Sequence, residues 1–369
     1  MGGPLVSFVI PCYKLARYLR PCLDSLLAQT YKNLELLVMD DCSPDETPAV
    51  AASYNDRRVR HVRNESNLGH LSNFNKGIGM ARGEYIWLIS ADDCLRSQDA
   101  VERYVSLMEQ NARLAYVFCP AMGLNGNGDE TGVVQGTRPF TRNVILDGRR
   151  FLAKLAEGNC VSAPSVMVRR RCYEAAGMHP SDLPHAGDWY LWCAFAFCGD
   201  IAYLDAPMVC YRRHGANMSS TLIATQPHVV REDNAKIRWR LKNMAEKAGF
   251  SEVARICVEH MAGLYSGVLA EAEPAQTCGS MTESIEAILE RHARADEREL
   301  IRTRIYGVLA DQLFWREKFE GAAYFYRRAL RGNPVQLEYA LKLALLKMDR
   351  SGVTVRKAVG RLRRLVRQG

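Results

Sequence analysis

Residues 85–93 constrain the fold more than any other stretch, because an apolar run ends there on two adjacent carboxylates. The stretch reads Tyr-Ile-Trp-Leu-Ile-Ser-Ala-Asp-Asp and follows Gly83. A short apolar run bounded by turn residues is typical of a strand that is buried on both faces of a sheet. We therefore expect a strand here, with Asp92 and Asp93 at its carboxyl end. The alternative interpretation is a strand that ends in a solvated turn.

Strand-like and helical segments alternate through the first 220 residues. Strands are expected over 5–11, 34–39 and 59–63, and the second of them also ends on paired acids, Asp40 and Asp41. Strands that alternate with helices of about 10–15 residues indicate βαβ units, and ligands bind beyond the carboxyl ends of such strands. The sequence therefore predicts an α/β fold with a mostly parallel central sheet and two acid pairs along one edge.

Paired carboxylates at a sheet edge suit a hard divalent cation. Carboxylate oxygens hold Mg²⁺ or Mn²⁺, whose remaining positions go to water and to substrate phosphate. We predict such a cation, with Asp92 as the first ligand and Asp93 as the second.

Six motifs, taken in order along residues 4–220, resemble those of family 2 glycosyltransferases, which have the nucleotide-sugar-binding GT-A fold. The resemblance implies an inverting enzyme that moves a sugar from a nucleoside diphosphate to a hydroxyl group. The motifs are Val-Ile-Pro-Cys-Tyr-Lys at 9–14, Val-Met-Asp-Asp-Cys-Ser-Pro-Asp at 38–45, Asn-Leu-Gly at 67–69, Ser-Ala-Asp-Asp at 90–93, Gly-Asp-Trp at 187–189 with Leu-Trp at 191–192, and Tyr-Arg-Arg-His at 211–214.

The resemblance implies a nucleotide pocket at the ends of the first two strands. Asp40 would accept a hydrogen bond from the ring N–H of uracil, and Pro11, Tyr13 and Asn67 would also contact the donor nucleotide. A carboxylate suits a donor edge, which favours uracil or thymine over cytosine, and we expect a UDP-linked sugar. The alternative role for Asp40 is a turn or helix-cap acid, and Asp41 is expected to be structural.

Two residues, one at the end of the strand expected over 208–212 and one just after it, extend the implied metal and phosphate site. By the resemblance, His214 would complete the metal site or touch the diphosphate, and Arg212 would contact phosphate. Their alternative roles are an ordinary surface or core histidine and a surface ion pair. Ser90 stands where the family commonly has a first acid, so part of the usual charge is missing.

Asp188 is the predicted general base. A carboxylate within hydrogen-bond reach of an acceptor hydroxyl deprotonates it as it attacks the anomeric carbon. The alternative role is a helix N-cap, and Gly187 stands where the family usually has Glu. Trp189 and Ser165, the latter in a strand expected over 162–167, are predicted acceptor contacts.

Residues 221–349 follow a helical pattern, which predicts an all-α region after a catalytic domain over 1–220. Within it, 306–334 resemble one tetratricopeptide repeat, but about three such units are needed for an independent array. A helical cap and a partner-binding array both stay open.

The rival function is a non-catalytic scaffold that keeps the sugar-nucleotide fold and docks partners. A nicotinamide oxidoreductase is disfavoured, because residues 11–13 follow the first strand where a Gly-rich turn would be needed.

The basic tail at 350–369 holds seven basic residues and no acid, within a net charge of +8. Apolar residues on one helical face make it suited to an anionic membrane surface, and a solvated terminus is the alternative. The tail has no aromatic residue, so we expect no nucleic acid partner. No stretch approaches the roughly 20 apolar residues of a membrane span. We therefore expect a cytoplasmic enzyme, peripheral on the inner face of the cell membrane, with a glycan or lipid-linked acceptor.

Overall fold

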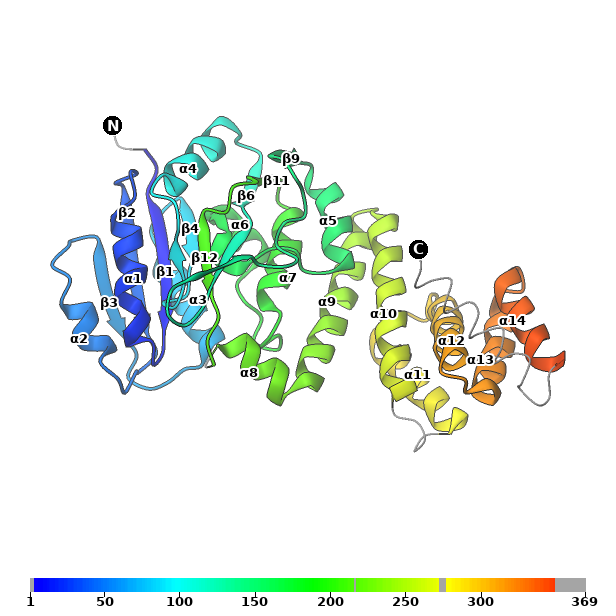
Figure 1. The fold of residues 1–369 in the computed structure, drawn as a ribbon. Helices are drawn as coiled ribbons and strands as arrows, with labels where there is room; N and C mark the ends of the chain where they lie inside the picture. The colour runs from blue at the N-terminus through cyan, green and yellow to red at the C-terminus, as the bar shows by residue number, and fades with distance from the viewer. Residues whose placement is uncertain (1–2, 216, 272–276, 349–369) are drawn as a thin grey trace. The chain divides into compact units, whose positions relative to one another are not determined.

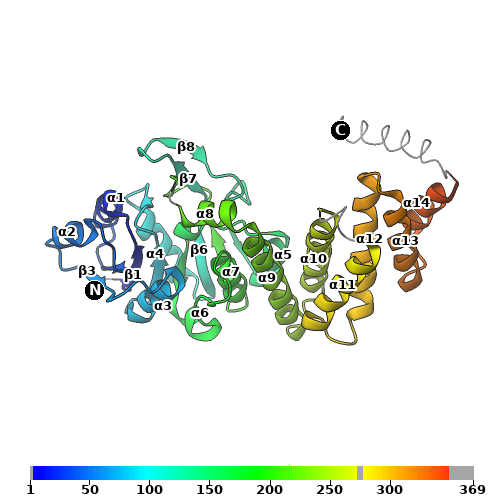
Figure 2. The ribbon, with the colours of Figure 1, turned by 90° about the horizontal axis from the view of Figure 1, so that it is seen from below.

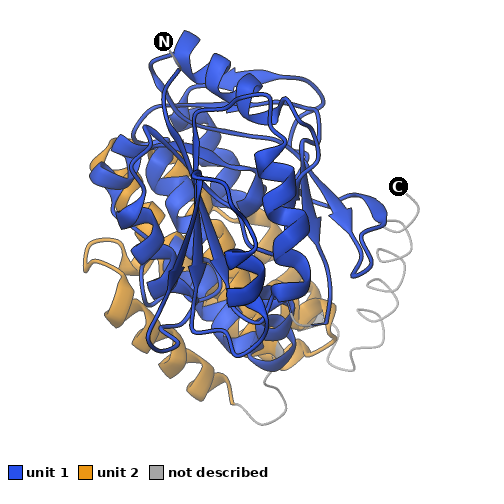
Figure 3. Cartoon of the chain, turned by 90° about the vertical axis from the view of Figure 1, so that its left-hand side faces the viewer, with its two compact units in different colours: residues 1–237 blue, residues 238–369 orange. Residues whose placement is uncertain are grey.

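The chain forms two compact units, residues 1–237 and 238–369 (Figure 3). The computed structural model describes residues 3–215, 217–271 and 277–348. The basic tail at 350–369, with its expected membrane contact, lies outside the described residues. Figure 1 labels the helices and strands.

An eight-stranded sheet lies at the centre of the first unit, counted over its described residues. The strands β1 to β4 run parallel to one another, and β6 runs parallel to β11, whereas β10 is antiparallel to β4 and β6, and β9 is antiparallel to β11. This confirms the predicted α/β class with a mostly parallel sheet. In spatial order the strands are β3 (Val59–Arg63), β2 (Leu34–Asp40), β1 (Val6–Cys12), β4 (Tyr85–Leu88), β10 (Met167–Arg169), β6 (Leu114–Phe118), β11 (Asp200–Tyr203) and β9 (Val144–Leu146).

Helices cover both faces of this sheet. The last helix of the first unit, α9, begins in that unit and ends in the second. Figure 2 shows α1 and α3 on opposite sides of β1. The helices are α1 (Ala16–Leu27), α2 (Thr47–Ala52), α3 (His70–Met80), α4 (Ala100–Gln110), α5 (Gly148–Glu157), α6 (Arg170–Ala176), α7 (Gly187–Ala196), α8 (Met218–Thr225) and α9 (Pro227–Lys247).

The alternation of side chains along β1 explains its continuous apolar sequence. Phe8 and Ile10 belong to the buried core that α1 and α4 complete. Val9 points to the other face, where a Cβ placed on Gly77 of α3 would lie 2.5 Å from its Cγ1. Because successive residues of a strand face opposite sides, a strand covered on both sides needs apolar residues throughout.

A second, four-stranded sheet brings a distant strand beside the acid pair that ends β4. Its order is β5 (Cys94–Leu95), β12 (Val209–Arg212), β7 (Ala121–Leu124) and β8 (Glu130–Val133). β5 begins directly after Asp93, and Cys94 pairs with Cys210 of β12. This pairing carries Arg212 to the Asp92–Asp93 turn.

The prediction of a strand over 162–167 was wrong. Ala163–Ser165 form a 3₁₀ turn, η1, and the strand β10 starts only at Met167. Pro164 has no N–H for a strand ladder and its fixed φ suits a turn. The Ser165 N–H closes the turn by donating to the Ser162 carbonyl at 3.0 Å.

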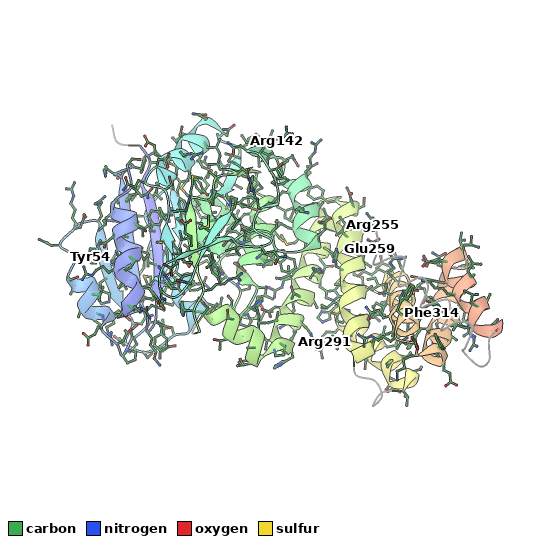
Figure 4. The ribbon with its side chains drawn as sticks, viewed as in Figure 1. Tyr54, Arg142, Arg255, Glu259, Arg291 and Phe314 are labelled. Atoms are coloured by element: carbon green, nitrogen blue, oxygen red, sulfur yellow. The ribbon has the colours of Figure 1, made fainter. Side chains whose placement is uncertain are left out.

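The second unit is helical through its described residues, which confirms the expected all-α region. Seven apolar or aromatic residues at the repeat-like positions of α12 and α13 are buried, whereas the tetratricopeptide assignment itself stays a prediction. Arg255 and Glu259 form an ion pair of 2.7 Å on α10 (Ser251–Glu271) (Figure 4). None of the described helices has the length and apolar character to cross a membrane. The helices are α10 (Ser251–Glu271), α11 (Cys278–His292), α12 (Arg298–Trp315), α13 (Phe319–Gly332) and α14 (Leu337–Met348).

Candidate active site

A cavity of about 440 Å³ opens at the carboxyl ends of β1, β2 and β4. Beyond the strands themselves, the Asp41 N–H donates to the Cys12 carbonyl at 2.9 Å and the Ala91 N–H donates to the Pro11 carbonyl at 3.1 Å. These bonds hold the two acidic segments on either side of the end of β1. Of the residues predicted from sequence, the cavity is lined by Pro11, Tyr13, Asn67, Asp92, Asp93 and Asp188.

His214 and Asn217 converge on one oxygen of Asp92. Asp92 Oδ2 lies 3.0 Å from His214 Nε2 and accepts a hydrogen bond of 3.2 Å from Asn217 Nδ2. The predicted neighbours Asp92 and His214 are therefore brought together. Asn217 was not predicted, because it lies beyond the last motif and has no distinguishing spacing.

Arg212, the last residue of β12, contacts the turn formed by Asp92 and Asp93, which we call the acid turn. Its backbone N–H donates to Asp93 Oδ1 at 2.9 Å, and its Nε donates to the Asp92 carbonyl at 2.9 Å. The side chain is buried and does not line the cavity. Its observed contacts thus fix the shape of the Asp92–Asp93 turn.

The burial of Asp93 makes the acid pair sensitive to nearby charge. Burial, followed by the neighbouring Asp92 carboxylate, raises the pKa of Asp93 well above its usual value. Two close carboxylates disfavour double ionisation unless a positive charge is present. Among the described residues, no group of three or more His, Cys, Asp or Glu side chains is arranged to hold a metal ion. A cation site at Asp92, Asp93 and His214 therefore stays a prediction.

Asp188 stands at the start of α7, partly exposed to the cavity. Burial raises its pKa to about 6, and the Trp189 N–H opposes this shift by donating to Asp188 Oδ1 at 2.6 Å. A carboxyl group with this pKa is mostly ionised at neutral pH and still a stronger base than an ordinary Asp. Such a value favours general-base catalysis near neutral pH.

The acid pair that ends β2 is divided between two roles. Asp40 is fully buried: its Oδ2 accepts a hydrogen bond of 2.9 Å from Arg63 Nη1, and its Oδ1 accepts from the Ser43 N–H at 2.8 Å. It does not line the cavity. The expectation that Asp40 contacts uracil does not fit this position, because the side chain is fully buried and away from the cavity.

Asp41 lines the cavity instead. It accepts hydrogen bonds from the Leu68 N–H at 2.8 Å and from the Gly69 N–H at 3.0 Å. Asn67 Oδ1 also accepts from the Gly69 N–H, at 3.0 Å, and Gly69 has a φ of 79°, which favours glycine. The Asn-Leu-Gly motif is thus the turn that holds Asp41 at the cavity. The sequence places Asp40 and Asp41 together and does not reveal which of them faces the ligand.

Tyr13 offers an aromatic surface on the cavity wall. Its side chain is 41% exposed and follows Pro11 and Cys12 at the end of β1. Stacking of a base on Tyr13 stays a prediction.

Ser165 and Trp189 lie outside the cavity, contrary to their expected role as acceptor contacts. Ser165 is fully buried and its Oγ donates to the Ser162 carbonyl at 2.7 Å. The Trp189 ring is buried, and its Nε1 donates to the Leu155 carbonyl at 3.0 Å. Both side chains stabilise the walls behind the site.

Three histidines that the sequence did not single out also line the cavity: His70, His179 and His185. They come from the start of α3 and from the segment before α7. Histidines at these separations form no motif, so only the folded chain reveals the cluster.

Comparisons with known proteins define the class. Residues 7–175 match the family model "Glycosyl transferase family 2". The chain is a glycosyltransferase, and the resemblance to family 2 that the motifs predicted is confirmed over residues 7–175. An uncharacterized glycosyltransferase of Rickettsia typhi is 28% identical over 224 residues, which are 60% of this chain and 68% of the relative. Glycosyltransferase GlyG of Streptococcus pneumoniae is 34% identical over 110 residues, covering 29% of this chain and 36% of GlyG.

A solved structure shares the fold. The crystal structure of S. aureus TarS 1–349 in complex with UDP-GlcNAc superposes with a TM-score of 0.57 at 16% identity, covering 93% of this chain and 91% of that chain. The GT-A fold expected from the sequence is thereby confirmed.

Proposed function

We propose that this glycosyltransferase moves a sugar from a UDP-linked donor to a hydroxyl group of a glycan or lipid-linked acceptor, with inversion at the anomeric carbon. The observation that carries the proposal is that one cavity joins Asp188, with its pKa of about 6, to Asp92 and Asp93. The proposed base and the acid pair proposed to hold a cation for the diphosphate thus lie on the walls of one cavity. From there they can act on the same bond, the one between the sugar and the diphosphate.

Asp188 would act on the acceptor. Its Oδ2 would take the hydroxyl proton while the acceptor oxygen attacks the anomeric carbon from the side opposite the departing diphosphate. One displacement of this kind inverts the configuration. General-base help contributes roughly 10²–10⁴-fold to such a step.

The chemistry of the acid turn suits Mg²⁺ or Mn²⁺. Carboxylate oxygens of Asp92 and Asp93 and the imidazole nitrogen of His214 are ligands that these cations accept. The raised pKa of Asp93 supports this fit, because a buried acid pair of this kind gains from an added positive charge. When bound, the cation would supply Lewis-acid stabilisation of the charge that develops on the leaving diphosphate.

The nucleotide would bind between Tyr13 and Asp41, with Pro11 and Asn67 beside it. Asp41 takes the place that the sequence suggested for Asp40, because Asp41 is the acid at the cavity. A carboxylate is an acceptor and pairs with the ring N–H of uracil. The TarS structure of the same fold names UDP-GlcNAc as its ligand, which makes UDP-sugars the first donors to test.

The test is UDP release from a panel of UDP-sugars in the presence of Mn²⁺, with wild type compared with Asp188→Asn. We expect the variant to lose at least about 100-fold in turnover while it still binds UDP. Asp182→Asn is the matched control, because Asp182 is exposed and lies outside the cavity. Equal turnover in Asp188→Asn would remove Asp188 as the base. UDP binding without turnover of any donor would favour the non-catalytic scaffold.

We also propose that the basic tail at 350–369 brings the enzyme to the anionic inner face of the cell membrane. Its seven basic residues without an acid support this, at about 1 kcal/mol each near such a surface. Sedimentation with vesicles that contain phosphatidylserine, compared between the full chain and a chain ending at residue 349, tests the proposal. Equal sedimentation of the two would refute it.

A further inference from the structure

The segment 177–186 leads into α7, the helix that carries Asp188, and contains turns but no helix or strand. α7 begins at Gly187, and its N-cap position is Ala186, whose side chain has no oxygen to cap the helix. The first N–H groups of a helix have no partner within the helix, so its start is fixed by outside contacts. The position of Asp188 in the first turn of α7 therefore depends on what holds this segment.

Asp233 of α9 contacts the segment at the start of α7. One carboxylate oxygen, Oδ2, accepts a hydrogen bond from the His185 N–H at 2.7 Å and another from the Ala186 N–H at 3.1 Å. The Ala186 carbonyl in turn accepts from the Tyr190 N–H at 3.1 Å, which is the first backbone bond of α7. Asp233 thus holds the peptide groups that directly precede the helix with Asp188 in its first turn.

The burial of Asp233 shows how closely this contact is packed. The residue is 1% exposed, and burial raises the pKa of its carboxyl group while the two N–H donors oppose the shift. A buried carboxylate lowers the stability of a fold unless hydrogen bonds compensate it. Bonds from backbone N–H groups to a carboxylate are roughly twice as strong as those between neutral groups. Because Asp233 does not line the cavity, these bonds are the contribution to the site that its position offers.

Other side chains hold the middle of the same segment by its carbonyl groups. His70 Nε2, at the start of α3, donates to the Pro184 carbonyl at 2.8 Å. Lys236 Nζ, three residues after Asp233 on α9, donates to the Asp182 carbonyl at 3.3 Å. The segment is therefore tied to two helices, and Asp233 supplies the contact next to α7.

We propose that Asp233 is a positioning residue, which fixes the start of α7 and so aims the Asp188 carboxylate at the acceptor hydroxyl. This rests on the proposed function, in which Asp188 is the base. A displacement of about 1 Å in a reacting geometry costs about 100-fold in rate, so an anchor of this kind governs turnover. Asp233 itself touches neither the substrate nor the reacting atoms.

Two substitutions separate the anchoring bonds from the charge. Asp233→Asn keeps a side-chain oxygen that can accept from both N–H groups, whereas Asp233→Ala removes it. Glu232→Ala is the matched control, because it removes a carboxylate from the adjacent position of the same helix. The Glu232 side chain is 60% exposed and pairs with Lys236 at 2.9 Å.

The first measurement is hydrogen exchange of the wild type and the three variants, read by mass spectrometry without ligand. In Asp233→Ala, we expect a peptide that covers residues 182–190 to exchange at least about tenfold faster, because two N–H groups lose their acceptor. The same peptide in Asp233→Asn and Glu232→Ala stays close to wild type. Peptides from β1 and β4 keep their wild-type exchange in every variant, which shows that the sheet is folded.

The second measurement separates turnover from binding. With Mn²⁺ and the preferred UDP-sugar, kcat for UDP release is expected to fall about 100-fold in Asp233→Ala. The affinity for UDP, measured by calorimetry, stays within about twofold of wild type, because the nucleotide end of the cavity is built by other segments. Asp233→Asn recovers kcat to within about tenfold of wild type, and Glu232→Ala retains it.

Three results would overturn the proposal while the proposed function stands. They are a wild-type kcat in Asp233→Ala, an equal loss of kcat in Asp233→Asn and Asp233→Ala, and a parallel loss of UDP affinity and kcat. The second result would assign the effect to the charge, and the third to the whole cavity. A wild-type protein that turns over no UDP-sugar overturns the proposed function, and the positioning role with it.

Discussion

Asp92 Oδ2 and His214 Nε2 lie 3.0 Å apart, although 122 residues separate them in the chain. The contact exists because β12 pairs with β5, which starts directly after the acid turn. It joins the two segments that we propose as the cation site.

Asp92→Asn is expected to lower the affinity for Mn²⁺, measured by calorimetry with UDP present, by at least tenfold. The amide keeps the shape of the side chain and removes the charge that a hard cation requires. Asp296→Asn in the second unit removes a carboxylate that is 72% exposed and serves as the control. Unchanged Mn²⁺ affinity in Asp92→Asn would exclude this carboxylate as a ligand.

Turnover is expected to fall as the pH drops through about 6, because Asp188 must be ionised to accept a proton. The pH profile of kcat/KM for UDP-sugar turnover checks this. A profile flat between pH 5 and 7 would contradict the assignment of Asp188 as the base.

The same pKa predicts an effect on stability with a definite sign. The pKa of Asp188 is raised from 3.8 to about 6 in the folded chain, so the folded state binds the proton more tightly than the unfolded state. Stability from this group is full below about pH 4 and is lost as the pH rises through about 6. Asp188→Asn should therefore be more stable than wild type at pH 7, by about 1–3 kcal/mol in chemical denaturation. A less stable variant would show that the charged carboxylate has stabilising contacts.

Asp40→Asn and Asp41→Asn are expected to separate structure from binding. Asp40→Asn weakens the bond to Arg63 and should lower the free energy of unfolding by about 1–3 kcal/mol, with UDP affinity near that of wild type. Asp41→Asn should weaken UDP binding about tenfold. Calorimetry with UDP, below the unfolding transition, measures the UDP affinity of both variants, and chemical denaturation measures the free energy of unfolding. The opposite result would return the base-reading role to Asp40.

Two glycines of α3 offer a matched pair for the packing of the helix on the sheet. A Cβ on Gly77 would lie 2.5 Å from Val9 Cγ1 and 2.9 Å from Met39 Cγ, whereas a Cβ on Gly79 meets nothing closer than Met178 Cε at 3.9 Å. Gly77→Ala should destabilise the fold by about 1–3 kcal/mol. Gly79→Ala should stabilise it by about 0.5–1 kcal/mol, because alanine restricts the unfolded chain. Equal effects in denaturation curves would refute the close approach at Gly77.

Several features of this chain follow from the sequence alone, because they depend on neighbouring residues. The apolar runs at 85–90 and 34–39 predict buried strands, and the acids that follow them are set at the strand ends by chain order. The motifs also suffice for the family and for the fold. The run at 162–167 misled because one proline outweighs its apolar neighbours.

Only the tertiary structure decided how the acids divide their roles. Side chains alternate at the end of β2, so Asp41 meets the cavity while Asp40 is buried against Arg63. The raised pKa of Asp188 depends on burial by segments from across the first unit, and so does the lack of a hydrogen-bond partner, among the described residues, for the Nδ1 atoms of His179 and His185. Desolvation and hydrogen-bond satisfaction are properties of the packed surroundings of an atom, and a linear sequence does not contain those surroundings.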